Sequence, residues 1–272
     1  MKFNKLLSLI TLLLITSCAS NIPKPVIEES SLDSLRAESL NRMSLQALES
    51  TNKNHKKLAL CHKKEYNKAS ELFKESLDKN QKNPHYWNQL GVCYFLKGEY
   101  SKSQMYLGIS EGLAKSKKMK AIVLNNQGLI QLKLANYPEA RELFSKSTEL
   151  NSRALTPKFN LAMLYSKFGL LGKAHKLLFQ LRKENKIDPD INYQIAHIYL
   201  LNKKFTLAKK YFEMIPDKYL KRDDVLTNYA TTLYYLGDYQ KAQKLLGEAP
   251  KQMPTYADAQ SNLSDQISKN LE

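Results

Sequence analysis

The sequence predicts an all-α chain in which about six helix–turn–helix units stack into an α-solenoid, with a further helix capping the C-terminal end. A 34-residue period is the first observation behind this prediction. Small residues recur at that interval, at Gly128, Ala162, Ala196 and Ala230. The second observation is that two further sets of equivalent repeat positions, or columns, recur in the same phase. One of these columns holds small residues and the other holds large apolar residues. Agreement of three columns indicates a repeat architecture.

The chain begins with a segment typical of exported proteins. Lys2 and Lys5 supply positive charge, and the apolar run 6–15 is far shorter than the ~20 residues that a membrane-spanning helix needs. An aliphatic residue lies three positions before Cys18, with small residues between them. This pattern resembles a bacterial lipoprotein signal. The resemblance implies that residues 1–17 are removed and that Cys18 is lipidated. An ordinary secretory signal cut near Ala19 is the alternative.

Two segments lead from the cysteine to the repeats. Residues 18–30 include Asn21–Pro25 and show no helical pattern, so we expect a lipidated tether. Residues 31–49 are predicted to form an N-terminal helix because their apolar residues recur at helical spacing, at Leu32, Leu35, Leu40, Met43, Ala47 and Leu48.

The columns have a physical reason. Counting Pro84 as the first position of its unit puts Gly91 at the eighth. The twentieth positions are small throughout: Ala69, Ser103, Ala140, Ala174, Ala208 and Ala242. The twenty-fourth positions are large: Phe73, Leu107, Phe144, Leu178, Phe212 and Leu246. Two antiparallel helices approach closely only where small residues leave room, and the large residue then fills the space towards the next unit. Single units cannot bury an apolar face, so they stack.

The segment Trp87–Tyr94 matches the pattern W-x₂-L-G-x₂-Y that opens a tetratricopeptide repeat (TPR). Over roughly residues 50 to 270 the chain therefore resembles a TPR protein, which implies a right-handed solenoid. The predicted array, 50–256, divides into the units 50–83, 84–120, 121–154, 155–188, 189–222 and 223–256. Residues 257–272 are predicted to form the capping helix, since Ala259, Leu263, Ile267 and Leu271 fall on one stripe.

Two units depart from the pattern. The first has Lys57 where a small residue is expected. The second is three residues longer, and the excess lies in 111–118, where it either extends a helix or forms a basic loop.

Charge and cysteine content bound the class of protein. The full chain carries 42 basic and 26 acidic residues, and the predicted leader holds two of the lysines and no acid, which leaves a net charge of +14. Outside the cytoplasm we expect no nucleic acid to bind, so the charge is a surface property and an aid near membranes.

Apart from Cys18 there are only Cys61 and Cys93. Both fall on predicted helices, which favours two packed thiols, with a disulfide as the alternative.

No pattern of catalytic residues is convincing. Gly108–Gly112 reads G-x-S-x-G, but the serine-hydrolase elbow needs a strand before it, and Ser110 occupies a packing position of its unit. The five histidines show no paired-ligand spacing, and His197 is expected at the surface. Glycine-rich phosphate loops are absent. We predict a non-catalytic protein without metal or cofactor. An enzyme built on the array stays a remote alternative.

The inner, concave face of the array is the predicted partner-binding site. First helices should line it with mainly apolar residues and some amides: Asn88, Val92, Phe95, Asn125, Leu129, Leu132, Phe159, Met163, Tyr193, His197, Leu200 and Tyr234. Such a groove suits an extended or amphipathic helical segment of a protein partner. Alternatively, some of these residues pack between first helices or under the capping helix. The lysine–asparagine clamp that grips a C-terminal carboxylate is absent from every unit.

Among repeat lipoproteins, the chain resembles the pilotins of type IV pilus systems (the PilF, PilW and Tgl kind). The segment Val123–Gly128 reads V-L-N-N-Q-G, similar to that family's V-L-N-N-x-G. The resemblance implies a lipoprotein on the periplasmic side of the outer membrane that binds secretin subunits and promotes their assembly. Ala19 after the lipidated cysteine fits release to the outer membrane. A general periplasmic adaptor for cell-wall enzymes or outer-membrane assembly factors is the alternative.

Overall fold

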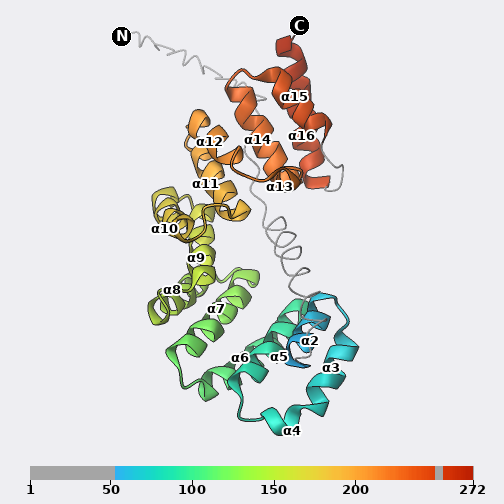
Figure 1. The fold of residues 1–272 in the computed structure, drawn as a ribbon, viewed down its shortest axis with the longest axis vertical. Helices are drawn as coiled ribbons and strands as arrows, with labels where there is room; N and C mark the ends of the chain where they lie inside the picture. Colours follow the sequence, from blue (N-terminus) through green and yellow to red (C-terminus); the bar gives the residue numbers. More distant parts are fainter. Residues whose placement is uncertain (1–52, 249–253, 272) are drawn as a thin grey trace, which may run out of the picture.

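The computed structural model describes residues 53–248 and 254–271, and these residues form fifteen helices and no strand (Figure 1). The prediction of an all-α solenoid is confirmed. The predicted leader, Cys18, the tether and the helix 31–49 lie outside the described residues. No described helix is long and apolar enough to cross a membrane.

Most of the helices form pairs, and successive pairs stack into a curved column, with α8 and α10 on its left margin and α7 and α9 beside them (Figure 1). The first helices of the six units are α2 (Lys53–His62), α5 (Pro84–Lys97), α7 (Lys117–Lys133), α9 (Leu155–Lys167), α11 (Pro189–Leu201) and α14 (Asp223–Tyr235). Their second helices are α3 (Tyr66–Glu75), α6 (Tyr100–Leu113), α8 (Tyr137–Leu150), α10 (Leu171–Glu184), α12 (Phe205–Phe212) and α15 (Tyr239–Gly247). The remaining helices are α4 (Leu77–Asn80), α13 (Asp217–Leu220) and α16 (Pro254–Leu271).

Each turn between a first and a second helix contains one residue in the left-handed region of backbone space. These residues are Lys64, Gly98, Ala135, Gly169, Lys203 and Gly237. A left-handed residue after a helix allows its last carbonyls to be paired while the chain reverses. Glycine adopts this conformation at little cost, whereas Ala135 (φ 58°) and Lys203 (φ 57°) do so against their own preference.

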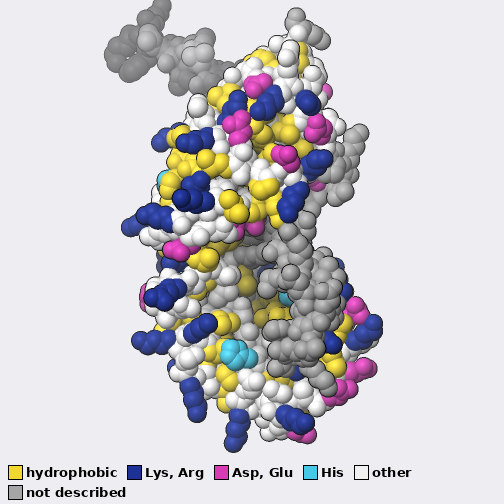
Figure 2. Space-filling model, in the orientation of Figure 1, with side chains coloured by type: hydrophobic (Ala, Val, Ile, Leu, Met, Phe, Trp, Pro, Cys, Tyr) yellow, Lys and Arg dark blue, Asp and Glu magenta, His cyan; other side chains and the backbone are white. Residues whose placement is uncertain are grey.

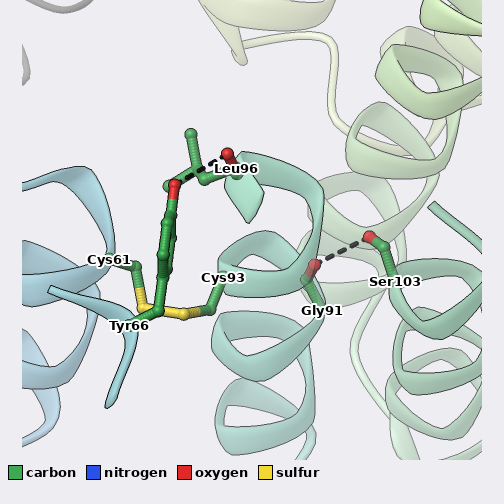
Figure 3. Close-up of a disulfide and its surroundings, with 6 residues drawn as sticks. All are labelled: Cys61, Tyr66, Gly91, Cys93, Leu96 and Ser103. Carbon is green, nitrogen blue, oxygen red and sulfur yellow. Dashed lines mark hydrogen bonds between the residues drawn. A yellow bond between two sulfur atoms is a disulfide. The ribbon is translucent and has the colours of Figure 1, made fainter. Parts of the chain in front are cut away.

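Close helix approach explains the small residues. A Cβ atom added to Gly91 would lie 2.8 Å from Leu107 Cγ, and one added to Gly128 would lie 2.6 Å from Phe144 Cε1. The Ser103 hydroxyl also donates a 2.7 Å hydrogen bond to the Gly91 carbonyl across the helix pair (Figure 3). The eighth, twentieth and twenty-fourth positions therefore meet within one unit.

The buried core is divided unevenly along the array. From unit 155–188 to α16 one continuous cluster runs through Leu178, Ile195, Phe212 and Leu263. The earlier units contribute three smaller clusters. Within α16, Leu263 and Ile267 are fully buried, so this helix closes the larger core.

The extra residues of the second unit lengthen a helix. α6 ends at Leu113 and α7 begins at Lys117, four positions before the start of the predicted unit 121–154. Ser116 caps α7, because its hydroxyl accepts a 3.1 Å hydrogen bond from the Met119 backbone N–H. This resolves the alternative between a longer helix and a basic loop in favour of the helix.

The expectation of two packed thiols is wrong, because Cys61 and Cys93 form a disulfide that joins α2 to α5 (Figure 3). Their Cα atoms are 5.3 Å apart, a separation that suits a bridge. Two helices of neighbouring units bring the residues together, so the general rarity of bridges between helices does not apply. Beside the bridge, the Tyr66 hydroxyl donates a 2.8 Å hydrogen bond to the Leu96 carbonyl.

Lys57 replaces a small residue without exposing its side chain. Only 1% of the residue is exposed, and its Nζ donates a 2.6 Å hydrogen bond to Ser76 Oγ. The same nitrogen lies 5.1 Å and 4.9 Å from the ring centroids of Phe73 and Tyr86. Desolvation lowers the pKa of Lys57. The rings of Phe73 and Tyr86 and the Ser76 hydroxyl thus hold the Lys57 ammonium. The other units have glycine or alanine at this eighth position.

Candidate partner-binding face

The predicted inner-face residues separate into two groups by exposure. All lie on the first helices α5, α7, α9, α11 and α14. Eight are half-buried: Asn88, Val92, Phe95, Leu129, Leu132, Phe159, Met163 and Tyr234. Four are buried: Asn125, Tyr193, His197 and Leu200. Most of the half-buried residues belong to units 84–120, 121–154 and 155–188.

Half-exposed apolar side chains form the face of α5, α7 and α9. Phe95 packs against Tyr100 with ring centroids 5.8 Å apart, which leaves part of its ring accessible. Leu129 and Leu132 border the cluster that contains Phe144. These side chains are held in place by the core beneath them while still presenting apolar surface, as a binding groove requires.

A row of amide hydrogen bonds, the amide ladder, runs along the same helices. Asn126 on α7 donates a 2.8 Å hydrogen bond to Asn88 on α5. Asn160 on α9 donates a bond of the same length to Asn125 on α7, and Asn125 donates to Asn126 at 3.3 Å. In both bonds between helices, the sixth position of one unit donates to the fifth position of the unit before it.

The ladder resumes in the C-terminal half. Asn228 on α14 donates a 2.9 Å hydrogen bond to the Tyr193 hydroxyl on α11, again from a sixth to a fifth position. Gln260 on α16 then donates a 3.0 Å bond to the Thr227 hydroxyl. Phe159 occupies the fifth position of the intervening unit and offers no side-chain acceptor there. The α16 helix thus stands where a seventh first helix would be.

The four buried residues are not open anchor residues, which corrects the prediction for Asn125, Tyr193, His197 and Leu200. Their exposed fractions are 7%, 4%, 3% and 2%. The Tyr193 ring stacks on His197 and also contacts Phe212 at a centroid distance of 6.2 Å. These buried residues therefore pack between helices, as the alternative interpretation of the inner face expected for some of its members.

The expectation of a surface histidine at His197 is also wrong. The Nε2 atom of His197 is buried and has no hydrogen-bond partner among the described residues. Desolvation lowers the pKa of His197 to about 4, so the imidazole is neutral at pH 7.

An ion-pair cluster that sequence reasoning missed lies beside Tyr193. The Arg222 guanidinium donates to Asp224 at 2.6 Å and to Asp190 at 3.2 Å. It also lies 5.4 Å from the centroid of the Tyr193 ring. The three charged residues connect the start of α11 to the start of α14. The only signal for this cluster in the sequence is that Asp190 and Asp224 occupy the second positions of their units, and that Arg222 lies close to Asp224 along the chain.

The hydrolase-like motif serves packing. Ser110 is fully buried, and its hydroxyl donates a 2.7 Å hydrogen bond to the Pro84 carbonyl. Ser147, the equivalent residue of the next unit, donates in the same way to the Ala121 carbonyl at 2.6 Å. Among the described residues there is no group of histidine, cysteine and acidic side chains that could hold a metal ion.

A family model for the tetratricopeptide repeat matches residues 189–213, which are α11 and α12. The TPR repeat-containing protein MJ1428 of Methanocaldococcus jannaschii is 27% identical over 147 residues. The match covers 52% of this chain and 25% of that protein, so the chain spans about a quarter of the length of this relative.

Solved structures share the fold over most of the chain. The structure of PilF from Pseudomonas aeruginosa superposes with a TM-score of 0.64 at 12% identity, covering 87% of this chain and 98% of PilF. PilW, described as a widely conserved type IV pilus biogenesis factor, gives a TM-score of 0.61 at 17% identity over 84% and 98% of the two chains. YrrB, a TPR protein with an unusual peptide-binding site, gives 0.53 at 16% identity over 72% and 97%. The fold is therefore that of a TPR solenoid, a typical scaffold for protein interactions.

Proposed function

We propose that this chain is a non-catalytic scaffold that holds a segment of a protein partner against its inner face. The half-exposed apolar side chains of α5, α7 and α9, bordered by the amide ladder, carry this proposal. Apolar residues such as Phe95 and Met163 supply contact area, and the half-buried ladder amides of Asn88 and Asn126 lie beside them within reach of a partner's backbone. The groove suits an extended strand or one face of an amphipathic helix.

The proposal extends to location and partner. Lipidation of Cys18 attaches the chain to the periplasmic side of the outer membrane, and the partner is a secretin whose assembly serves type IV pilus biogenesis. Three observations support this: the lipoprotein-like start of the chain, Ala19 after the cysteine, and a common fold over nearly the whole of PilF and PilW. A single acyl chain binds membranes weakly, so stable attachment requires several.

A pull-down from detergent-solubilised envelope tests the proposal. The mature lipidated chain serves as bait beside a double variant, Phe95→Glu with Met163→Glu, whose charges would stand in the apolar groove. Met105→Glu with Ile109→Glu is the matched control, because both residues lie on the second helix α6 and are 53% and 38% exposed. Tyr193 is unsuitable for this purpose, since a carboxylate at a buried site would destabilise the fold.

We expect a secretin to be the leading specific prey of the wild-type chain and of the control, and to be lost with the groove variant. Circular dichroism should show equal helix content for all three baits. Cell-wall enzymes or outer-membrane assembly factors in place of a secretin would favour the general adaptor. Equal capture by the groove variant would rule out the groove as the binding face.

A further inference from the structure

A second surface of the array lies outside the inner face. It is formed by two successive turns between first and second helices, residues 167–173 and 201–207, which we call the turn edge. The two turns are neighbours, because one small hollow of about 190 Å³ is lined from both sides. The first turn and α10 contribute Leu171, Gly172 and His175; α11 and the second turn contribute Ile198, Tyr199, Asn202 and Lys204.

Apolar side chains project from the turn edge. Phe168 is 52% exposed and Leu170 is 43% exposed, and both lie in the turn between α9 and α10. The preceding turn adds Leu134, which is 49% exposed. The Phe168 ring makes a T-shaped contact with the Tyr137 ring at a centroid distance of 5.1 Å, so Phe168 is positioned while remaining accessible. Grouped exposed apolar residues at turns are characteristic of an interaction surface.

The two segments that form the turn edge carry charge of one sign. The segments 167–176 and 201–210 contain seven lysines and no acidic residue: Lys167, Lys173, Lys176, Lys203, Lys204, Lys209 and Lys210. Of these, Lys209 reaches Asp238 at 3.6 Å, whereas Lys203 and Lys204 have no ion pair with a described residue. Figure 2 shows lysine and arginine side chains around hydrophobic patches over the part of the molecule formed by α10, α11 and α12.

The hollow itself lacks a negative group. His175 Nε2 lies 3.0 Å from the Tyr199 hydroxyl, and Lys204 stands at the same rim. Burial, and then the charge of Lys204, lower the pKa of His175. The lining therefore offers a cation, hydrogen-bonding groups and apolar walls, a combination suited to a phosphate that carries an apolar chain.

We propose that the turn edge docks on an anionic phospholipid surface. Phe168 and Leu170 enter the head-group region, while the lysines on both turns contact lipid phosphates, with one head group seated in the hollow. Uniform positive charge over two successive turns matches a continuous sheet of anionic head groups. The contact is independent of the lipid proposed for Cys18 and of the groove, and it would orient an anchored array with one edge against the membrane.

Vesicle co-sedimentation of residues 19–272, which contain every described residue but not Cys18, tests the proposal. Vesicles of phosphatidylcholine with a quarter of phosphatidylglycerol are compared with vesicles of phosphatidylcholine alone. We expect binding to the anionic vesicles only, weakening as salt is raised. A lysine near such a surface contributes about a five-fold increase in affinity. Lys173→Glu with Lys204→Glu should therefore lower binding at least ten-fold, as should Phe168→Ser with Leu170→Ser.

Controls at the opposite edge match these changes. Lys117→Glu with Lys118→Glu alters net charge equally at the start of α7, and Ile187→Ser with Leu155→Ser removes two apolar side chains that are 78% and 41% exposed. Both should bind as the wild-type chain does. An equal loss in the controls would mean that overall charge alone attracts the protein, which overturns the proposal. Turn-edge variants that keep vesicle binding but lose a protein captured by the wild type would instead make the edge a protein interface.

Discussion

Asn160 on α9 donates a 2.8 Å hydrogen bond to the side-chain oxygen of Asn125 on α7, in a part of the array where both residues are at least 90% buried. The same relation between a sixth and a fifth position joins α5 to α7 and α11 to α14. The inner face is therefore stabilised by polar contacts between units, in addition to the apolar contacts of the core.

Removing a buried donor of this ladder should destabilise the array. Asn160→Ala leaves the Asn125 oxygen without its donor, and an unsatisfied buried acceptor costs about 1–3 kcal/mol of unfolding free energy. Asn88→Ala is the control, because Asn88 is half-buried and water can replace the bond that it accepts from Asn126. Urea denaturation followed by circular dichroism measures both. Equal losses would mean that burial of the ladder has no energetic consequence.

The close approach of α7 and α8 predicts a second effect. In Gly128→Ala the new Cβ would meet the Phe144 ring at 2.6 Å, so we expect a loss of about 1–3 kcal/mol. Gly172→Ala should be neutral or stabilising by up to ~1 kcal/mol, since a Cβ there meets nothing within 4 Å. Adding Phe144→Leu to the first variant should restore part of its stability. Thermal unfolding of the wild type, the two single glycine variants and the double variant measures these differences in stability.

The disulfide should hold the first unit to the array. Cys61 and Cys93 are 32 residues apart, and closing a loop of that length stabilises by about 3–4 kcal/mol in the chain-entropy model. Cys93→Ala should therefore lower the protection of α2 and α3 amides from hydrogen exchange, with little change in α11 or α14. Wild-type protein under reductant should behave as the variant does, and the variant should not respond to reductant. Unchanged protection of α2 would contradict the prediction.

The repeat columns predicted helix pairing well because they are local. Gly91 meets Leu107, and Gly128 meets Phe144, within single units, so spacing along the chain carries the information. The position of Ser110 in its unit likewise predicted a packing role over a catalytic one.

Contacts between units were predicted less well. Cys61 reaches Cys93, and Lys57 reaches Tyr86, across the boundary between a degenerate unit and its neighbour. The burial of Tyr193 and His197 depends on how closely neighbouring first helices pack, which hydrophobic periodicity does not report. Because exposure decides which inner-face residues can touch a partner, the sequence alone predicted the face but not its accessible part.

His197 should make stability depend on pH. In the unfolded chain a histidine takes up a proton near pH 6.5, whereas in the folded protein the pKa of His197 is about 4. Between these values the unfolded state binds more protons, so the free energy of unfolding falls as pH drops below 6.5 and stops changing below about pH 4. At pH 5 the loss attributable to this residue is about 2 kcal/mol. A variant that cannot titrate, His197→Gln, should lack that part of the pH dependence. Urea denaturation of both proteins at pH 7.5 and pH 5 isolates the effect, because His62 and His175 contribute equally to each. If the two proteins lose the same stability on acidification, His197 titrates normally, and the burial of its imidazole does not control its charge.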